Sequence, residues 1–518
     1  MRRPGLAPTA MVVMSLLFAL WSWLTFSTGL FASFDATSLA QTVGPMSAWG
    51  QILAGIALIT TPAVLSLGLA AATFWAGRRR LNHLAWAMGL AIPLVWGGSY
   101  LMKLVFHRQR PPTALPLITS EGFSYPSGHM MAITAVAVLA VSAFVHTRQR
   151  TSMVILVSVV AAAAWILVGY NRWALRAHWF TDVIGGTLLG AALAALALTV
   201  AGVRVEPLPS SPSSALGANE HRRRVALIIN PTRIPDPAVF RRQVASACAQ
   251  RGWAPPVWLE TEVDDPGRAA ARRAQRRRVD LVIAAGGDGT VRAVCGSMAG
   301  TEIPVAILPV GTANLLARNL GIPLDLSDAL EVAFDGEPRP IDLVQIRADD
   351  HAPQPSVVMA GMGADAALMQ STNEDLKKMV GTAAYVVAVP SGINQKPFAA
   401  TIAIDDREPE PRIPRLVLVA NVGRIPGVDL SPGALPDDGL FDVALASPKH
   451  RGGWAAITTS VLARSTDSPS VERTRAKRIV IDTEEPIPYQ IDGDAVGTCQ
   501  RFDAALLPLA IRIIVPSR

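Results

Sequence analysis

The stretch VIAAGGDGTVRAV, at residues 282–294, decides how the C-terminal half of this chain is expected to fold. An apolar run enters a turn that contains Gly286, Gly287 and Gly289, and a helix-like segment follows. Glycine lets backbone N–H groups close around an anion, and a helix N-terminus attracts negative charge. The stretch therefore predicts a strand, a phosphate-binding turn and a helix. It matches neither the Walker A nor the G-x-G-x-x-G pattern, so a merely tight turn is an equal alternative for this motif alone.

Composition divides the chain into two halves. Of its 518 residues, 50% are hydrophobic and 17% are charged, a shift toward the membrane class. Only three acidic residues, Asp35, Glu121 and Asp182, precede residue 206, whereas acids and bases alternate after it. We therefore predict a membrane half followed by a soluble half.

The net charge and the cysteines indicate which partners the chain binds and in which cellular compartment its soluble half lies. The net charge is +7, and much of the excess comes from arginines that flank apolar runs, so no nucleic-acid partner is expected. The three cysteines, Cys248, Cys295 and Cys499, lie far apart in the soluble half without metal-ligand spacing. They predict no disulfide framework and a reducing, cytosolic environment for that half.

Apolar runs of about 20 residues are long enough to cross a bilayer as helices. The first run follows Arg2 and Arg3 and lacks a clear small-residue cleavage site, so we expect an uncleaved first span. The predicted fold of the N-terminal half is an all-α bundle of six transmembrane helices. The runs lie near 8–28, 50–76, 84–106, 130–146, 152–170 and 183–203.

Loop charges predict the orientation of this multi-pass protein in the cell (inner) membrane. Four arginine-rich ends fall on one side of a six-span bundle, which places the N-terminus and the soluble half in the cytosol. The opposite side receives loops 107–129 and 171–182, which are also basic. Binding a phosphate would explain basic residues there, and tolerance of short basic loops is the alternative. The arginine-rich ends are Arg2 and Arg3, Arg78 to Arg80, Arg148 and Arg150, and Arg222 to Arg224.

The basic residues of these loops form a pattern suited to phosphate. Arginine presents a planar fork to phosphate oxygens, lysine a point charge, and Gly128 allows backbone amides close to an anion. His178 and Asp182 are spaced i, i+4, so the carboxylate can fix the imidazole tautomer and leave the other nitrogen free to attack. His129 is a candidate acid for the leaving oxygen. The pattern comprises Lys103 and Arg110 in KLVFHRQRP, Ser127, Gly128 and His129 in YPSGH, and Arg172, His178 and Asp182 in NRWALRAHWFTD.

Between about residues 100 and 182 the chain resembles the type 2 phosphatidic acid phosphatase family, whose pattern is K-x6-RP, PSGH and SR-x5-H-x3-D on six membrane helices. The resemblance implies a metal-independent phosphatase with His178 as nucleophile, Asp182 as its support and His129 as the proton donor. Asn171 replaces the family serine, and we expect a changed rate rather than an inactive site. The implied phosphate-binding residues are Lys103, Arg110, Ser127, Gly128 and Arg172.

The soluble half opens with alternating strand-like and helix-like runs. VALIINP, PPVWLE, DLVIAA and PVAILP predict a parallel doubly wound sheet with ligand loops at the strand C-ends. After about residue 355 the runs RLVLVAN, GLFDVALA, AKRIVID and PIPYQIDGD predict a β-rich subdomain, which LPLAIRIIV ends as a C-terminal strand. The predicted parts are a transmembrane domain over 1–204, a flexible Pro- and Ser-rich linker over 205–223, an α/β nucleotide-binding subdomain over 224–355 and the β-rich subdomain over 356–518.

A series of short motifs indicates which family the soluble half resembles. The chain has NPT at 230–232, GGDGT at 286–290, GTANLLARNLG from Gly311, GMGADA at 361–366, LPDDGLFDV at 435–443 and QIDGD at 490–494. In this order they resemble the diacylglycerol kinase catalytic family, which includes sphingosine and bacterial lipid kinases. The resemblance covers about residues 222 to 516 and implies ATP in a cleft between the two subdomains. The matching nucleotide-binding positions are Asn230, Thr232, Gly286, Gly287, Asp288, Gly289, Thr290, Thr312 and, more weakly, Thr261.

The same resemblance implies magnesium and a catalytic base. Asp288 suits a magnesium or bound-water role, and Asp342 matches an acid of the same network. Asp438 and the Leu440 carbonyl match a second, structural magnesium site. Asp494 stands where the family has glutamate as the base for the lipid hydroxyl. Leu315 replaces an aspartate common in the magnesium network, and Arg292 and Ala293 replace a common Asn-Glu.

Together these features predict a bifunctional membrane lipid enzyme. Its kinase half would phosphorylate a diacylglycerol-like lipid hydroxyl on the cytosolic side, and its phosphatase half would dephosphorylate a lipid phosphate or diphosphate on the outer side. One alternative is a lipid kinase anchored by an inactive phosphatase-like domain. The other is a lipid phosphatase whose kinase-like domain senses ATP or lipid. The arginine-rich run RAAARRAQRRR is either a solvated helix face or a contact with anionic lipid.

Overall fold

A computed structural model describes twelve stretches of the chain, and two compact units can be distinguished in it. One unit comprises Met1–Ser214 with Pro235–Gln243, and the other comprises Ala215–Ile234 with Val244–Arg518. We call them the helical half and the α/β half. The predicted linker lies almost wholly outside the described residues, as do residues 364–366 of the GMGADA motif. The described residues are 6–38, 47–79, 81–111, 122–203, 205, 222–234, 236–363, 396–422, 424–425, 428–429, 435–447 and 471–517.

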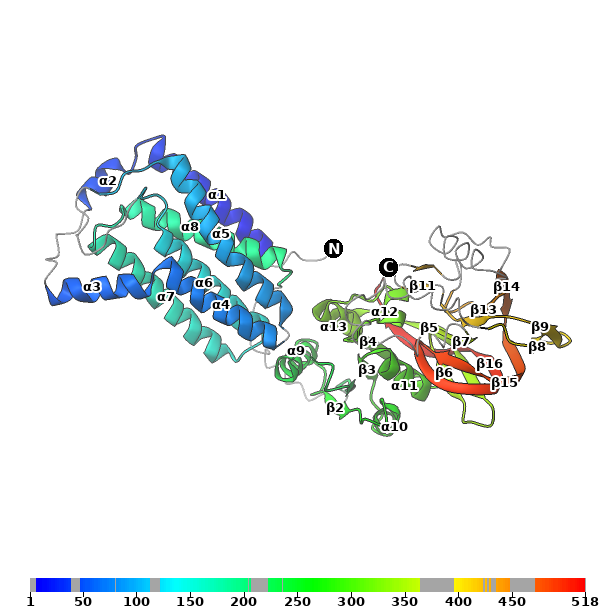
Figure 1. The fold of residues 1–518 in the computed structure, drawn as a ribbon. Coiled ribbons are helices and arrows are strands. Elements are labelled where there is room, and N and C mark those ends of the chain that lie inside the picture. The colour runs from blue at the N-terminus through cyan, green and yellow to red at the C-terminus, as the bar shows by residue number, and fades with distance from the viewer. Residues whose placement is uncertain are drawn as a thin grey trace. The chain divides into compact units, whose positions relative to one another are not determined.

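Among the described residues, five helices of the helical half are long and apolar enough to cross a membrane, and Figure 1 shows where they lie in this half. The short helix α2 (Ala32–Thr37) follows the first of them. The expected span at 50–76 differs, because it is a pair, α3 (Ala48–Ile59) and α4 (Pro62–Arg78), bent by 43°. The described residues therefore contain five such helices, or six spans if this bent pair makes one. The five helices are α1 (Leu6–Phe26), α5 (Asn82–Phe106), α6 (Gly128–His146), α7 (Thr151–Ala174) and α8 (Phe180–Val200).

The break between α3 and α4 has a local cause. Pro62 is the first residue of α4 and has no N–H to donate to the preceding turn. Thr61 instead caps α4, because its side chain accepts a hydrogen bond from the Val64 N–H. A continuous helix through this point would place Pro62 in its interior, where the missing N–H breaks the hydrogen-bond ladder, and would lose the Thr61 cap.

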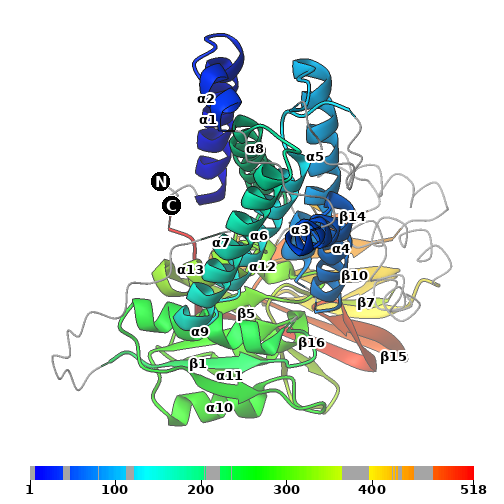
Figure 2. The same ribbon diagram turned by 90° about the vertical axis from the view of Figure 1, so that its left-hand side faces the viewer.

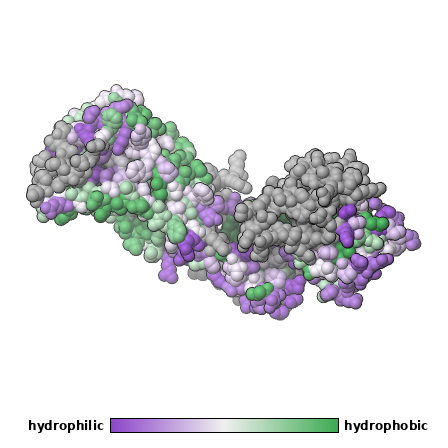
Figure 3. All heavy atoms as spheres, viewed as in Figure 1, coloured by the Kyte–Doolittle hydropathy of each residue, from purple (hydrophilic) through white to green (hydrophobic). Residues whose placement is uncertain are grey.

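Burial in the helical half follows the small residues of α8. Ala194 and Ala197 are fully buried and pack with Leu139 of α6 and Ala91 of α5 in one apolar cluster. By contrast, large apolar side chains such as Trp86 face outward, and Figure 3 shows hydrophobic residues over much of the surface of this half. An apolar exterior of this kind matches a lipid environment.

The α/β half is built on one large sheet. Its first four strands run parallel in the order β4-β3-β1-β2, as the doubly wound prediction requires. Figures 1 and 2 both show α10 (Arg268–Arg276) and α13 (Leu326–Asp335) on opposite sides of these strands. The helices α11 (Asp288–Met298) and α12 (Leu315–Asn319) also belong to this half, whereas α9 (Pro237–Gln250) is divided between the units after Gln243. The parallel strands are β1 (Val225–Ile229), β2 (Val257–Glu260), β3 (Leu281–Gly286) and β4 (Val305–Pro309).

The β-rich part continues this sheet with antiparallel pairs in the order β14-β13-β10-β7-β15-β16. Two long strands replace several of the short predicted ones. RIVID of the predicted run AKRIVID and PIPYQI belong to one strand, β15 (Arg478–Ile491), while Ala476 ends β14, and LPLAIRIIV is the end of β16 (Asp494–Val515). The other strands are β5 (Glu337–Ala348), β6 (Gln354–Ser356), β7 (Met359–Gly363), β8 (Ala400–Ile404), β9 (Glu410–Arg412), β10 (Leu416–Ala420), β13 (Phe441–Ala446) and β14 (Val471–Ala476), with a separate pair β11 (Arg424–Ile425) and β12 (Val428–Asp429).

Candidate active sites

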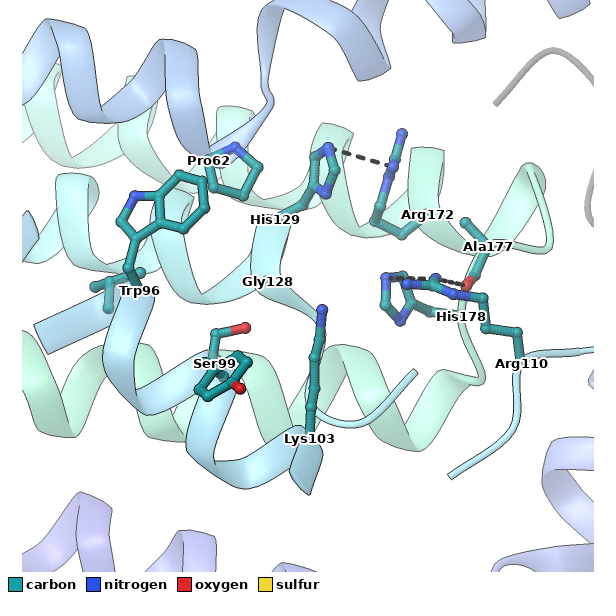
Figure 4. A pocket seen from close by; sticks show the side chains of 12 residues that line it. Pro62, Trp96, Ser99, Lys103, Arg110, Gly128, His129, Arg172, Ala177 and His178 are labelled. Carbon is teal, nitrogen blue, oxygen red and sulfur yellow. Dashed lines mark hydrogen bonds between the residues drawn. The ribbon is translucent and has the colours of Figure 1, made fainter. Parts of the chain in front are cut away.

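A cavity of about 280 Å³ in the helical half collects most of the predicted phosphate-binding residues (Figure 4). One wall is basic, and the other is formed by apolar and aromatic side chains such as Val95 and Trp96. In Figure 4 the Lys103 side chain extends from α5 toward the space between Gly128 and His178. The basic lining consists of Lys103, Arg110, His129, Arg172 and His178.

His178 and Asp182 are adjacent and buried. Nδ1 of His178 lies 3.5 Å from Oδ2 of Asp182. Trp179 is the N-cap of α8 and its backbone N–H donates to the same Asp182 oxygen at 3.0 Å, so the pair is formed by a capping turn rather than along one helix. Burial lowers the pKa of His178 to about 4, although Asp182 acts in the opposite direction. The imidazole is therefore neutral at pH 7, with Nε2 turned away from the carboxylate.

The neighbouring arginines are held rigidly by other groups. Arg110 donates from Nη1 to the Ala177 carbonyl at 2.8 Å, and the same nitrogen lies 3.5 Å from Nε2 of His178. Arg172 is almost fully buried, and Nη1 lies 3.3 Å from Nε2 of His129. Both guanidinium groups thus border the two candidate catalytic histidines.

Ser127 and Gly128 begin α6 at the edge of the cavity. Ser127 is the N-cap residue, yet its side chain makes no capping bond, and its buried Oγ has no hydrogen-bond partner within the part of the chain that the structure describes. A buried hydroxyl without a partner is costly unless a ligand or water satisfies it. This orphaned group therefore suits a bound phosphate.

In the α/β half the predicted nucleotide residues gather at the C-terminal ends of the parallel strands. Asn230 follows β1, Thr261 follows β2 and Gly286 ends β3, while Thr312 lies in the loop after β4. The Asn230 side chain accepts hydrogen bonds from the N–H and hydroxyl of Thr232. These loops share one edge of the sheet, where doubly wound folds bind ligands.

Two glycine loops touch at this edge. A Cβ on Gly311 would lie 2.6 Å from the Cα of Gly287, so the second loop has no room for a side chain there, whereas a Cβ on Gly287 would meet the Gly311 Cα at an ordinary 3.6 Å. Asp288 joins them, because its carboxylate accepts the N–H groups of Asn314 at 3.0 Å and Leu315 at 2.6 Å. Leu315, whose side chain is buried, contributes this N–H and no metal ligand. Gly289 and Thr290 continue α11 beyond Asp288.

Asp494 lies against the first glycine loop. A Cβ on Gly289 would be 3.6 Å from Oδ2 of Asp494, and Arg292 of α11 pairs with that oxygen at 3.2 Å. Arg292 also donates to the Ile491 carbonyl at 2.5 Å. Asp492 holds the turn from inside, because it is buried and accepts three backbone N–H groups of residues 357–359. The candidate base is thus next to the turn expected to hold phosphate.

Three family profiles match the chain. The PAP2 superfamily matches residues 80–206, the Diacylglycerol kinase catalytic domain matches 224–346, and the YegS C-terminal NAD kinase beta sandwich-like domain matches 356–515. A probable lipid kinase of YegS-like type from Stenotrophomonas maltophilia (strain K279a) is 30% identical over 249 residues, which are 46% of this chain and 80% of that protein. The chain belongs to the diacylglycerol kinase catalytic family and carries a PAP2 superfamily domain.

Two further comparisons concern one domain each. The diacylglycerol kinase of Bacillus subtilis (strain 168) is 29% identical over 287 residues, which are 53% of this chain and 91% of that protein. A transmembrane PAP2-type phosphatidylglycerolphosphate phosphatase structure from Bacillus subtilis shares 25% identity, with a TM-score of 0.29, over 37% of this chain and 94% of that chain.

In the kinase domain the predicted metal residues are dispersed. Both carboxylate oxygens of Asp342 accept backbone N–H groups, from Leu509 at 2.6 Å and Gly439 at 2.9 Å. Asp438 accepts the Leu440 N–H at 3.1 Å. Among the described residues, no group of three or more His, Cys, Asp or Glu side chains is placed to hold a metal. A magnesium ion here would take most of its ligands from water and nucleotide phosphates, as Mg²⁺ commonly does.

The PAP2 domain contains functional candidates that the predicted site did not include. Asn171 orients Arg172, and the glycines of α8 bring that helix against α6: a Cβ on Gly186 would lie 2.5 Å from the Ser127 carbonyl oxygen. Arg108 and Asp35 contact Asp182 or its partners. The sequence signals for the last two were an arginine in an outer loop and one of only three acids in the N-terminal half.

Proposed function

We propose that the chain is a bifunctional membrane lipid enzyme. The kinase domain transfers phosphate from ATP to a diacylglycerol-like hydroxyl, and the PAP2 domain hydrolyses a lipid phosphate or diphosphate. The observation that carries this is that each domain brings a candidate reactive group to a matching anion site. His178 lines a cavity that is also lined by cationic side chains, and Asp494 lies next to the glycine loop at Gly289.

The phosphatase step follows from the tautomer that Asp182 favours. A proton on Nδ1 of His178 faces Asp182, so Nε2 has a free lone pair on the cavity side. Nε2 forms a bond to phosphorus as the bond between phosphorus and the lipid oxygen breaks, and His129 gives that oxygen a proton. Water then attacks the phosphohistidine and returns a proton to His129, which releases inorganic phosphate. For its acid role His129 must exchange its contact with Arg172 for one with the leaving oxygen.

In the kinase step Asp494 accepts the proton of the lipid hydroxyl. The hydroxyl oxygen bonds to the γ-phosphorus, and ADP leaves with the electron pair of the broken bond. Asp288 would hold a magnesium ion through the carboxylate lone pairs that its two backbone N–H bonds leave unused. When bound, magnesium would neutralise part of the phosphate charge. Arg292 keeps the Asp494 carboxylate beside the glycine loop.

The two sites are proposed to face opposite sides of the membrane, which would keep the activities from cancelling each other. A cysteine placed at Thr113 tests this, because the three native cysteines are buried and give little background. An impermeant thiol reagent applied from outside should label the variant in intact cells. Labelling only after the cytosolic side is exposed would contradict the proposed sidedness.

The function is tested in detergent micelles with magnesium, labelled ATP and diacylglycerol. The His178→Ala chain is used for the kinase assay, because an active phosphatase would erase the product. Labelled phosphatidic acid should form, and adding Asp494→Ala should abolish it, since a general base contributes roughly 10²- to 10⁴-fold. In reverse, the Asp494→Ala chain should release phosphate from phosphatidic acid, and His178→Ala should not.

Two outcomes would replace the proposal. Phosphate release that survives His178→Ala would identify a contaminant and favour a kinase anchored by the PAP2 domain. Absence of transfer to diacylglycerol and to a panel of other lipid alcohols would favour a phosphatase with a sensing kinase domain. Leu315 and Asp494, which depart from the family pattern, are the residues that keep the second outcome open.

A further inference from the structure

A buried ionic network lies behind Asp182 on the side away from the cavity. Oδ2 of Asp182 faces His178, whereas Oδ1 accepts a hydrogen bond from Nη1 of Arg108 at 2.7 Å. The same Arg108 nitrogen donates to the Thr181 hydroxyl at 2.6 Å. Arg108 therefore fixes the rotation of the carboxylate whose other oxygen meets the candidate nucleophile.

The second nitrogen of Arg108 reaches a residue far away in the sequence. Nη2 donates to Oδ2 of Asp35 at 2.6 Å, and Asp35 is only 3% exposed. Asp35 also accepts the Thr181 N–H at 3.2 Å and the Thr181 hydroxyl at 2.6 Å. Two aromatic rings, of Phe26 and Trp179, lie under the guanidinium within 5.6 Å and 5.5 Å. Arg108 thus contacts one carboxylate through Nη1 and another through Nη2, and its guanidinium lies over two aromatic rings.

The charges of this network suit the proposed reaction. A fully buried carboxylate such as Asp182 is costly without a positive partner and would tend to take the proton of His178. Arg108 supplies that partner without touching the cavity. Asp35 in turn pairs with the second nitrogen of Arg108. Without Asp35, the guanidinium would lose one of its two buried carboxylate partners and would be free to contact Asp182 in a different geometry.

We propose that Arg108 and Asp35 are positioning residues of the phosphatase site, with Arg108 orienting Asp182 and Asp35 orienting Arg108. This rests on the proposed phosphatase function. It extends the site to α2, which lies outside residues 80–206 matched by the PAP2 profile. The competing explanation is that the network only anchors α2 to the bundle.

The test uses the full-length chain in detergent, with phosphate release from phosphatidic acid as the first readout. Arg108→Ala and Asp35→Asn should lower kcat by about 10- to 100-fold, the usual effect of losing an outer partner that orients a reacting group. KM should stay within about twofold, because neither residue lines the cavity. Arg108→Lys should retain intermediate activity, because it keeps the charge but reaches only one carboxylate.

A matched control separates positioning from anchoring. Phe34→Ala removes a ring contact between α2 and Phe180 and leaves the ionic network intact. Trp173→Phe removes the indole hydrogen bond to the Ser38 carbonyl at the end of α2. If these controls lower kcat as much as Asp35→Asn does, the network is only an anchor and the proposal is wrong.

A second readout needs no turnover. In ¹⁵N NMR of histidine-labelled protein, with the His178→Ala spectrum for assignment, His178 should be the neutral tautomer protonated at Nδ1. Arg108→Ala should shift it to a mixture of tautomers. A wild-type chain that shows the expected tautomer but releases no phosphate would overturn the proposed function, whereas a tautomer mixture in Arg108→Ala would still show that Arg108 orients the Asp182–His178 pair. Unchanged kcat and an unchanged tautomer in Arg108→Ala would overturn the inference alone.

Discussion

The side-chain oxygen of Asn171 accepts hydrogen bonds from two nitrogens of its neighbour Arg172, Nε at 3.1 Å and Nη2. The Asn171 amide group also donates to the Leu53 carbonyl of α3 at 2.8 Å. The residue that departs from the PAP2 pattern is therefore the one that sets the direction of the buried arginine. It also ties the arginine to the bent pair of helices that borders the cavity.

We expect Asn171→Ser, which restores the family residue, to weaken this site rather than improve it. A serine hydroxyl cannot both accept from two arginine nitrogens and reach Leu53. Loss of one hydrogen bond to a charged group should lower kcat/KM for phosphate release by about 10-fold. Steady-state kinetics in micelles would check this, and an unchanged or higher kcat/KM would show that Asn171 does not orient Arg172.

Arg292→Ala should slow the kinase without weakening ATP binding. Within the described residues the arginine pairs with the half-exposed Asp494 and donates to the Ile491 carbonyl. A partly exposed ion pair of this kind accounts for about fivefold in rate. Transfer to diacylglycerol in the His178→Ala background is the measurement. Arg251→Ala, which removes a pair with Asp335 elsewhere in the domain, is the matched control and should leave the rate unchanged.

The phosphatase should remain active in mildly acidic solution. Burial lowers the pKa of His178 to about 4, so the nucleophile loses activity only as the pH falls through that value. At pH 5 roughly nine tenths of His178 would be neutral, against about 3% for a histidine with the ordinary pKa of 6.5. The pH dependence of kcat, corrected for substrate ionisation, checks this. An acid limb centred near pH 6.5 would contradict the burial seen here.

Gly186→Ala should destabilise the PAP2 domain. The added Cβ would lie 2.5 Å from the Ser127 carbonyl oxygen, so α8 must move away from the start of α6. Overpacking of this kind costs about 1–3 kcal/mol. Thermal unfolding in detergent should show a lower midpoint together with a loss of phosphate release. Gly68→Ala on α4, where nothing lies within 4 Å of the new Cβ, should change neither.

The sequence predicted those features that depend on a regular spacing between residues close together in the chain. His178 and Asp182 do meet, although through the capping turn at Trp179 rather than along a helix. The alternation of strand and helix after residue 225 correctly predicted the parallel sheet, because buried strands and amphipathic helices leave distinct periods. Those patterns depend on neighbours in the chain, so one sequence is enough to detect them.

Contacts between distant residues were not predictable in the same way. Asp35 stood out only as a rare acid, and nothing near it in the sequence indicates Arg108 or Thr181 as its partners. The bend at Pro62 likewise breaks a run that hydropathy alone joins into one span. The roles assigned to Asp288, Asp342 and Asp438 as metal ligands stay predictions, since each also has a structural role in accepting backbone N–H groups.

Strand β16 begins at the candidate base Asp494 and ends beside β4, where Ile513 pairs with Val305 of the nucleotide-binding sheet. This strand, with an irregularity in its pairing between Leu507 and Ile511, therefore joins the group that would take the lipid proton to the strands that carry the phosphate loops. Because β16 pairs with β15 near its start and with β4 near its end, a wider space between the two subdomains would require this strand to bend.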